Sequence, residues 1–85
     1  MKIKDSFITH NADGEQIMVD SECNFSGIIR NNATAAFIVE CLSEDTTEEE
    51  ITIKLYERYD AEREVIAADV HEVIEKLKSV GAIDE

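Results

Sequence analysis

The sequence contains no proline, no tryptophan, only three glycines and only two cysteines among its 85 residues. Two cysteines are too few for the disulfide framework of a small secreted domain. The chain does not begin with a charged segment followed by an apolar one and a small-residue cleavage site, so no signal peptide is predicted. Apolar runs extend over a few residues, far short of the roughly 20 that cross a bilayer. These absences favour a cytoplasmic protein with no membrane span.

Basic residues are also scarce: 8 lysines and arginines stand against 20 aspartates and glutamates, which gives a net charge of −12. A field of this sign repels phosphate groups, because nucleic-acid affinity comes from basic side chains that displace counterions. Nucleic acid and anionic membrane surfaces are therefore poor candidate partners. The 44% hydrophobic content is that of an ordinary folded chain, and we expect a single domain over residues 1–85 with one modest core.

The first third of the sequence has the residue pattern of β-strands. Residues 7–9 and 17–19 are short β-favouring runs, and residues 11–14 between them end in the glycine of a hairpin turn. A third run, Phe25 to Ile29, contains Gly27, which is typical of a bulge or a close backbone approach. Three strands in succession predict an antiparallel meander.

After the strands, the apolar residues recur at helical spacing. Asn32 is expected to cap a short first helix with apolar residues at 36, 37, 41 and 42. Thr47 and Glu50 have the spacing of a capping box, which predicts the start of a second helix. That helix is expected to run to about Tyr59 and to turn residues 51, 55 and 59 inward.

A third helix, capped by Asp60 and ended by Gly81, has the strongest periodicity. Ile83 is expected to fold back onto its last turn. Its apolar stripe consists of Ile66, Val70, Val73, Leu77 and Val80, and Ala67 and Ile74 widen it to about 140°, at 100° per residue. Two interpretations remain open: a neighbouring helix and the sheet cover the whole stripe, or one flank of it forms a groove open to a partner.

Residue types that carry catalysis or bind metals are few. His10 and His71 are the only imidazoles, and neither has a triad partner at a suitable spacing. His71 is expected to form a solvated pair with Glu75 one turn later. Cys23 and Cys41 form no C-x-x-C motif, and Cys41 is expected to be a buried, reduced thiol. No glycine-rich phosphate-binding motif occurs. We therefore predict no catalytic residues, no metal and no cofactor, and a function in binding.

Several pieces of the chain follow one another in an order and spacing that is more specific than any one of them alone. They are MKIKDSF at 1–7, FSGII at 25–29, NATAAFI at 32–38, TEEEI at 47–51, and Asp69, Val70, Leu77 and Gly81. In these residues and in the order of its strands and helices, the sequence resembles the PqqD family of coenzyme PQQ synthesis proteins over nearly the whole chain. The resemblance implies an α+β, winged-helix-like fold with a three-stranded antiparallel sheet followed by three helices.

The resemblance also implies a peptide-recognition module that serves enzymes of ribosomal peptide modification. In such modules the precursor's leader peptide adds as an antiparallel strand beside the third strand and lies against the third helix. The module presents it to a modifying enzyme, often of the radical SAM type. Both the PQQ pathway and another peptide-modification system are compatible with the resemblance. The implied peptide-binding residues are Phe25, Ser26, Gly27, Ile28 and Ile29, with Ile66, Ala67, Val70, His71 and Ile74 on the third helix.

Two other functions are compatible with the same elements. A structural or dimerisation subunit would pack the wide stripe of the third helix against a second copy. A winged-helix DNA-binding protein would place a recognition helix in the major groove. The acidic second and third helices argue against DNA, whereas an open sheet edge supports peptide binding, because an extended peptide can complete its free N–H and C=O groups.

Overall fold

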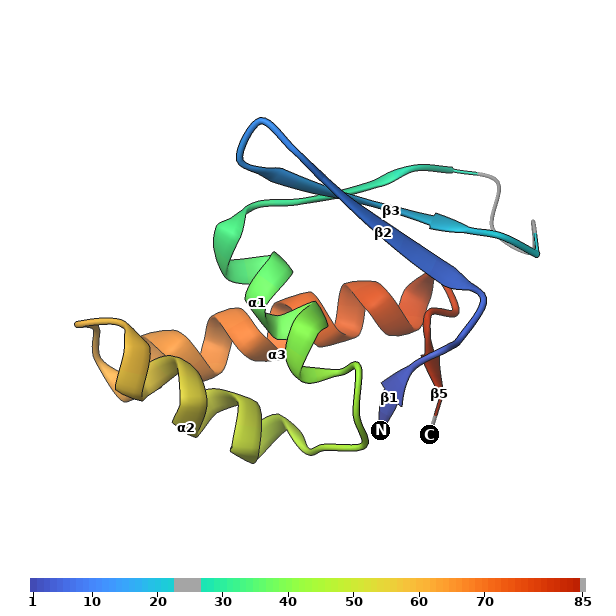
Figure 1. Ribbon diagram of the computed structural model, residues 1–85. Coiled ribbons are helices and arrows are strands. Elements are labelled where there is room, and N and C mark those ends of the chain that lie inside the picture. The colour runs from blue at the N-terminus through green and yellow to red at the C-terminus, as the bar shows by residue number, and fades with distance from the viewer. Residues whose placement is uncertain (23–26, 85) are drawn as a thin grey trace.

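The computed structural model describes residues 1–22 and 27–84 of the chain. Within these residues a small sheet lies over the helices in an α+β fold (Figure 1). The predicted three-stranded antiparallel sheet followed by three helices is confirmed. In chain order the elements are β1 (Lys2–Ile3), β2 (Phe7–Ala12), β3 (Glu15–Asp20), β4 (Ile29–Asn31), α1 (Ala33–Cys41), α2 (Glu48–Arg58), α3 (Arg63–Ser79) and β5 (Ile83–Asp84).

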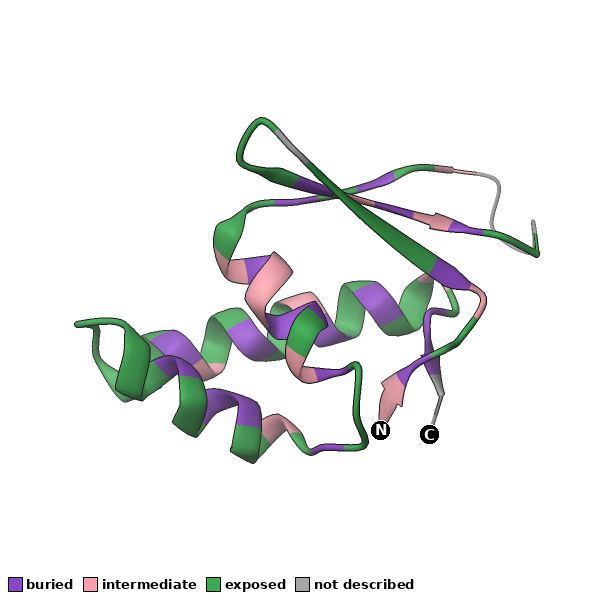
Figure 2. Ribbon diagram, in the orientation of Figure 1, coloured by how far each residue is buried: buried purple, intermediate pink, exposed green. Residues whose placement is uncertain are grey.

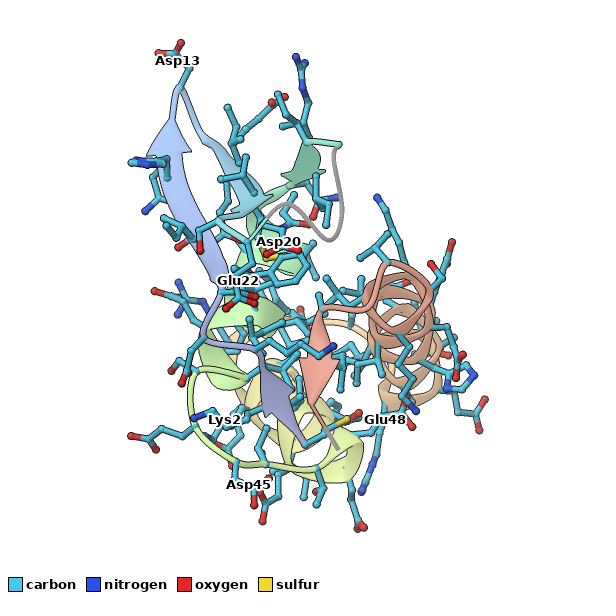
Figure 3. All side chains as sticks on the ribbon, turned by 90° about the vertical axis from the view of Figure 1, so that its right-hand side faces the viewer. Lys2, Asp13, Asp20, Glu22, Asp45 and Glu48 are labelled. Atoms are coloured by element: carbon cyan, nitrogen blue, oxygen red, sulfur yellow. The ribbon has the colours of Figure 1, made fainter. Side chains whose placement is uncertain are left out.

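The main sheet has the strand order β2-β3-β4. β2 and β3 form a hairpin whose last register pair is Ala12 with Glu15. The two residues between them, Asp13 and Gly14, have φ angles of 50° and 80°. Positive φ at both central residues is what a tight hairpin turn of the type I′ class requires, and an Asp-Gly pair tolerates it well. The predicted hairpin is therefore confirmed, and Figure 3 shows Asp13 at its tip, at the opposite end of the molecule from Asp45.

The third strand lies later in the sequence than predicted. β4 begins at Ile29 and pairs with β3 as far as Asn31, opposite Gln16. Gly27 and Ile28 precede the strand, and residues 25 and 26 lie outside the described residues. The prediction stopped too early because Asn31 is polar and does not continue an apolar run. Its side chain is nevertheless buried.

The first helix begins where predicted. The side-chain oxygen of Asn32 accepts a hydrogen bond of 2.9 Å from the backbone N–H of Ala35, which satisfies one N–H that the helix leaves unpaired. The face that α1 buries differs from the expected one. Ala35, Ile38 and Val39 are buried, whereas Phe37 is only partly buried. A stretch that is apolar on nearly all sides does not indicate which side meets the sheet.

The second helix is capped by Thr47, whose hydroxyl accepts a hydrogen bond of 3.2 Å from the N–H of Glu50. In a complete capping box the Glu50 carboxylate would accept a hydrogen bond from the backbone N–H of Thr47. Here it accepts one of 2.8 Å from the Thr46 hydroxyl instead. The helix ends before Tyr59, as predicted. Tyr59 itself is not an inward residue, because 37% of its surface is exposed.

The third helix begins later than predicted. Glu62, and not Asp60, is the residue that precedes it, and no side chain caps its first turn. Its end is as predicted, since Gly81 has a φ of 77° and the N–H of Ala82 donates a hydrogen bond of 2.9 Å to the carbonyl of Leu77.

The two ends of the described chain meet in a second, two-stranded sheet. Ile83 of β5 pairs with Ile3 of β1 in antiparallel register, beside α3 (Figure 1). The sequence predicted only that Ile83 folds back onto the last helical turn, because pairing across nearly the whole chain has no local signal. Both isoleucines are buried.

The hydrophobic core lies between the sheet and the helices (Figure 2). Its fully buried large side chains come from all three helices and from β3, and they are Met18, Ile38, Leu42, Ile51, Leu55, Val70, Ile74 and Leu77. None of the helices in the described residues is both long enough and apolar enough to cross a membrane.

Candidate functional site

The sheet has two outer strands, β2 and β4, and each pairs with β3 on one side. No strand in the described part of the chain pairs with the other side of either one. The backbone groups that alternate toward such an edge are free to bind an added strand. The surroundings of the two edges therefore decide what each could bind.

Next to β4 lies a cavity of about 340 Å³. Arg30 and Asn31 of β4 and the first residues of α1 form one wall. The opposite wall is the face of α3 that carries Asp69, Glu72, Val73 and Lys76. We call this cavity the β4–α3 groove. It lies between a free strand edge and a helix, so a chain in it can bind backbone groups on one side and side chains on the other.

The β4–α3 groove is lined by charges of both signs. Asp69, Glu72, Lys76 and Arg30 are all exposed. No ion pair within 4.0 Å joins any of them to another charge among the described residues. Their charges are therefore available to a ligand.

A buried polar pair holds β4 in place at the groove. Asn31 and Gln16, which face each other across the strands, are only 4% and 5% exposed. The side-chain amide of Asn31 donates a hydrogen bond of 2.9 Å to the side-chain oxygen of Gln16. Since an unsatisfied buried amide is costly, this bond favours the observed register of β4 over a shifted one.

The other edge, at β2, borders a cavity of about 470 Å³. This cavity lies between β2 and α1 and is lined by Lys4, Asp5, Glu40 and Ser43 as well as by core residues. It is a second candidate for an added strand. It contacts no residue of α3, so the two edges can be told apart experimentally.

The predicted strand residues that the structure describes come just before Arg30 in the chain, and none of them lines the β4–α3 groove. Ile29 is the first residue of β4 and is buried. Ile28 precedes it and is 65% exposed, and Gly27 is partly buried. The remaining two predicted residues, Phe25 and Ser26, lie outside the described residues.

The predicted residues of α3 do not line this groove. Ile66, Val70 and Ile74 are buried in the core, where α3 packs against α2 and α1. Neither of the two interpretations left open by the sequence holds in full, because Ile66, Val70, Ile74 and Leu77 are covered, whereas Val73 is only partly buried and lines the groove. The groove face lies roughly a third of a turn further around the helix.

Ala67 and His71 also point away from the groove. Ala67 lines a small cavity with residues at the start of α2. The Nδ1 atom of His71 lies 2.9 Å from the Glu48 carboxylate of α2, and Nε2 lies 3.8 Å from Glu75, which confirms the predicted pair one turn apart. In the sequence, the groove face is marked only by the helical spacing of Asp69, Glu72 and Lys76 next to Val73. Any solvent-exposed helix face has polar residues at this spacing, so the pattern did not identify a site.

Groups with chemical reactivity are sparse around the groove. Among the described residues there is no cluster of three side chains that could hold a metal ion. Cys41 is a free thiol and is partly buried, and burial raises its pKa above the ordinary value. A thiol with a raised pKa is a poor nucleophile at neutral pH.

Comparison with known proteins gives two kinds of match. Residues 13–83 match the family Coenzyme PQQ synthesis protein D (PqqD). No curated protein matches the chain.

Two solved structures share the fold. One is TbiB1 in complex with the TbiA(beta) leader peptide, which is 23% identical with a TM-score of 0.78 over 99% of this chain and 100% of that chain. The other is a lasso peptide synthetase B1 complexed with the leader peptide, 21% identical with a TM-score of 0.78 over 95% of this chain and 93% of that chain. Because the family match extends over most of the sequence, this chain belongs to the PqqD family.

Proposed function

We propose that this protein is a non-catalytic module that binds the leader of a ribosomally made precursor peptide and presents it to a modifying enzyme. The observation that carries the proposal is the free edge of β4, which faces α3 across the groove of about 340 Å³. In this mode the leader extends the sheet as a strand next to β4. Main-chain hydrogen bonds then supply affinity, and the side chains of α3 supply selectivity.

The direction of the bound peptide follows from the arrangement of the elements. β4 and α3 run in opposite directions (Figure 1). A peptide that pairs with β4 in antiparallel register therefore runs in the same direction as α3. Its N-terminal part lies near the start of α3, around Asp69, and its C-terminal part lies toward Lys76.

The comparisons support this choice of ligand, and the family resemblance of the sequence supports the choice of edge. Both similar solved structures are complexes with leader peptides, and the resemblance of the sequence to the PqqD family points to β4 as the edge. We further propose that the enzyme partner is of the radical SAM type and that the 85 residues act as one domain. The proposed place of action is the cytoplasm, where ribosomes release the precursor.

The rival role as a dimerisation subunit rested on the wide apolar stripe of α3. Most of that stripe is covered within the monomer, since Ile66, Val70, Ile74 and Leu77 are buried. A second copy could cover only the partly buried remainder of the stripe, at Ala67, Val73 and Val80. Peptide binding is therefore the better supported function.

A binding titration tests the proposal. A labelled leader from the precursor encoded beside this protein's gene should bind with a dissociation constant of about 1 μM or lower, as judged by fluorescence anisotropy. Backbone amide shifts should gather at residues 27–32 and along the groove face of α3. A scrambled leader of equal composition is the control. Shifts confined to α2, or equal affinity for the scrambled peptide, would reject the proposal.

A further inference from the structure

A further cavity, of about 180 Å³, lies where α2 ends and α3 begins. Leu55 of α2 and Val65 and Ile66 of α3 line it, together with Tyr59 and Ala61 from the connecting segment. We call it the α2–α3 pocket. Most of its lining residues are apolar, with Thr34 and Asp69 as the exceptions, whereas the β4–α3 groove is lined by several charges.

The α2–α3 pocket has a buried floor and an open mouth. Leu55 and Ile66 are buried, whereas Val65 is 53% exposed and Tyr59 is 37% exposed. The volume is sufficient for one ring, since an apolar cavity of about 150 Å³ holds a benzene molecule. An apolar side chain that enters from solvent would cover the exposed surface of Val65 and Tyr59 and gain the free energy of leaving water.

The pocket adjoins the β4–α3 groove. Thr34, at the start of α1, and Asp69, on α3, line both cavities. The pocket therefore lies at the end of the groove that is nearer the start of α3. A peptide that pairs with β4 in antiparallel register would bring its N-terminal side to this end.

We propose that the α2–α3 pocket selects peptides with a bulky apolar side chain, aromatic or large aliphatic, a fixed distance N-terminal to the segment that pairs with β4. This inference rests on the proposed function. Asp69 stands at the junction of the two cavities, and Glu72 follows it on the groove face. A basic residue in the peptide between the anchor and the paired segment would meet both carboxylates. The selected peptide thus has an apolar anchor, then a basic residue, then an extended segment.

A selection from a random 12-residue peptide library displayed on phage tests this order, because it needs no knowledge of the natural ligand. Enriched sequences should share an extended β-favouring segment and should place the apolar anchor at one constant spacing before it. The tightest peptide is then synthesised with its anchor residue and with alanine in its place. Both versions are titrated against the parent protein and the variants.

The informative variant is Val65→Asp, which puts a charge at the mouth of the α2–α3 pocket. Val65 is half-exposed and lies in the first turn of α3, where an acidic residue suits the helix, so the fold should persist. The matched control is Ile53→Asp on α2, which changes an exposed isoleucine that lines neither cavity. Val65→Asp should lower the affinity for the peptide with the anchor about tenfold and hardly change the affinity for its alanine version. Ile53→Asp should change neither affinity.

Three outcomes would count against the inference, and they are distinguishable. If selected peptides bind at β4 but have no apolar residue at a constant N-terminal spacing, the pocket has no role and the proposed function stands. The same holds if Val65→Asp and Ile53→Asp weaken binding equally. If no peptide is enriched at all, the proposed function fails and the inference fails with it. Thermal unfolding of both variants confirms that each loss is measured on folded protein.

Discussion

Asn31 of β4 donates a side-chain hydrogen bond of 2.9 Å to Gln16 of β3, and both side chains are buried. The two residues are also register partners in the sheet. This bond joins the strand that borders the β4–α3 groove to the centre of the sheet. The position of the free edge therefore depends on a polar contact inside an otherwise apolar layer.

Breaking this contact from one side should destabilise the fold. Asn31→Leu leaves the Gln16 amide buried without its partner, and we expect a loss of about 1–3 kcal/mol in the free energy of unfolding, measured by urea denaturation. The double variant Asn31→Leu with Gln16→Leu removes both polar groups and should recover most of the loss. A single variant as stable as the parent would show that the bond does not hold β4.

Two neighbouring residues of α3 should respond in opposite ways to the same substitution. Ile74 is a core residue, so Ile74→Asp forces a charge inside and should cost several kcal/mol, about enough to unfold a domain of this size. Val73 is only partly buried and lines the groove, so Val73→Asp should leave most of the protein folded but lower its affinity for the leader. Circular dichroism melting and leader titration measure the two effects. An Ile74→Asp variant that stays folded but no longer binds the leader would show that Ile74 belongs to the binding surface and not to the core.

The carboxylates of the groove should make binding of a basic leader sensitive to salt. Asp69 and Glu72 are exposed on the groove wall, and exposed charges act mainly on the association rate. Raising the salt from about 0.05 M to about 0.5 M should slow association in stopped-flow measurements, because the Debye length shortens. Asp69→Asn with Glu72→Gln should remove much of this dependence. The control, Glu49→Gln with Glu57→Gln, makes an equal change of charge on exposed residues of α2 and should reduce the salt dependence of the association rate less. If both double variants reduce it equally, only the net charge of the protein matters.

Local features of the fold could be predicted from the sequence, because the residues that cause them lie within a few positions of each other. Asn32 and Thr47 cap their helices as predicted, and Gly81 ends α3. The cap at Asp60 was wrong, since the chain continues past it to Glu62 before the helix starts.

Features that depend on distant contacts could not be predicted in the same way. Pairing of Ile3 with Ile83 joins opposite ends of the chain and leaves no local pattern. The groove face of α3 was misplaced for a related reason. Helical spacing shows that Ile66, Val70 and Ile74 share a side. Only the positions of α1 and α2 decide that this side is buried, and only the position of β4 decides that Asp69 faces the groove.

Hydrogen exchange at the strand edges tests the central claim most directly. In the free protein, the amides of β4 should alternate, with those bonded to β3 exchanging slowly and those at the free edge exchanging fast. Saturation with the leader should slow the fast amides among residues 28–32 and leave the amides of β2 unchanged. Protection that appears along β2 instead, or a bound leader that leaves the β4 amides as fast as before, would contradict strand addition at β4.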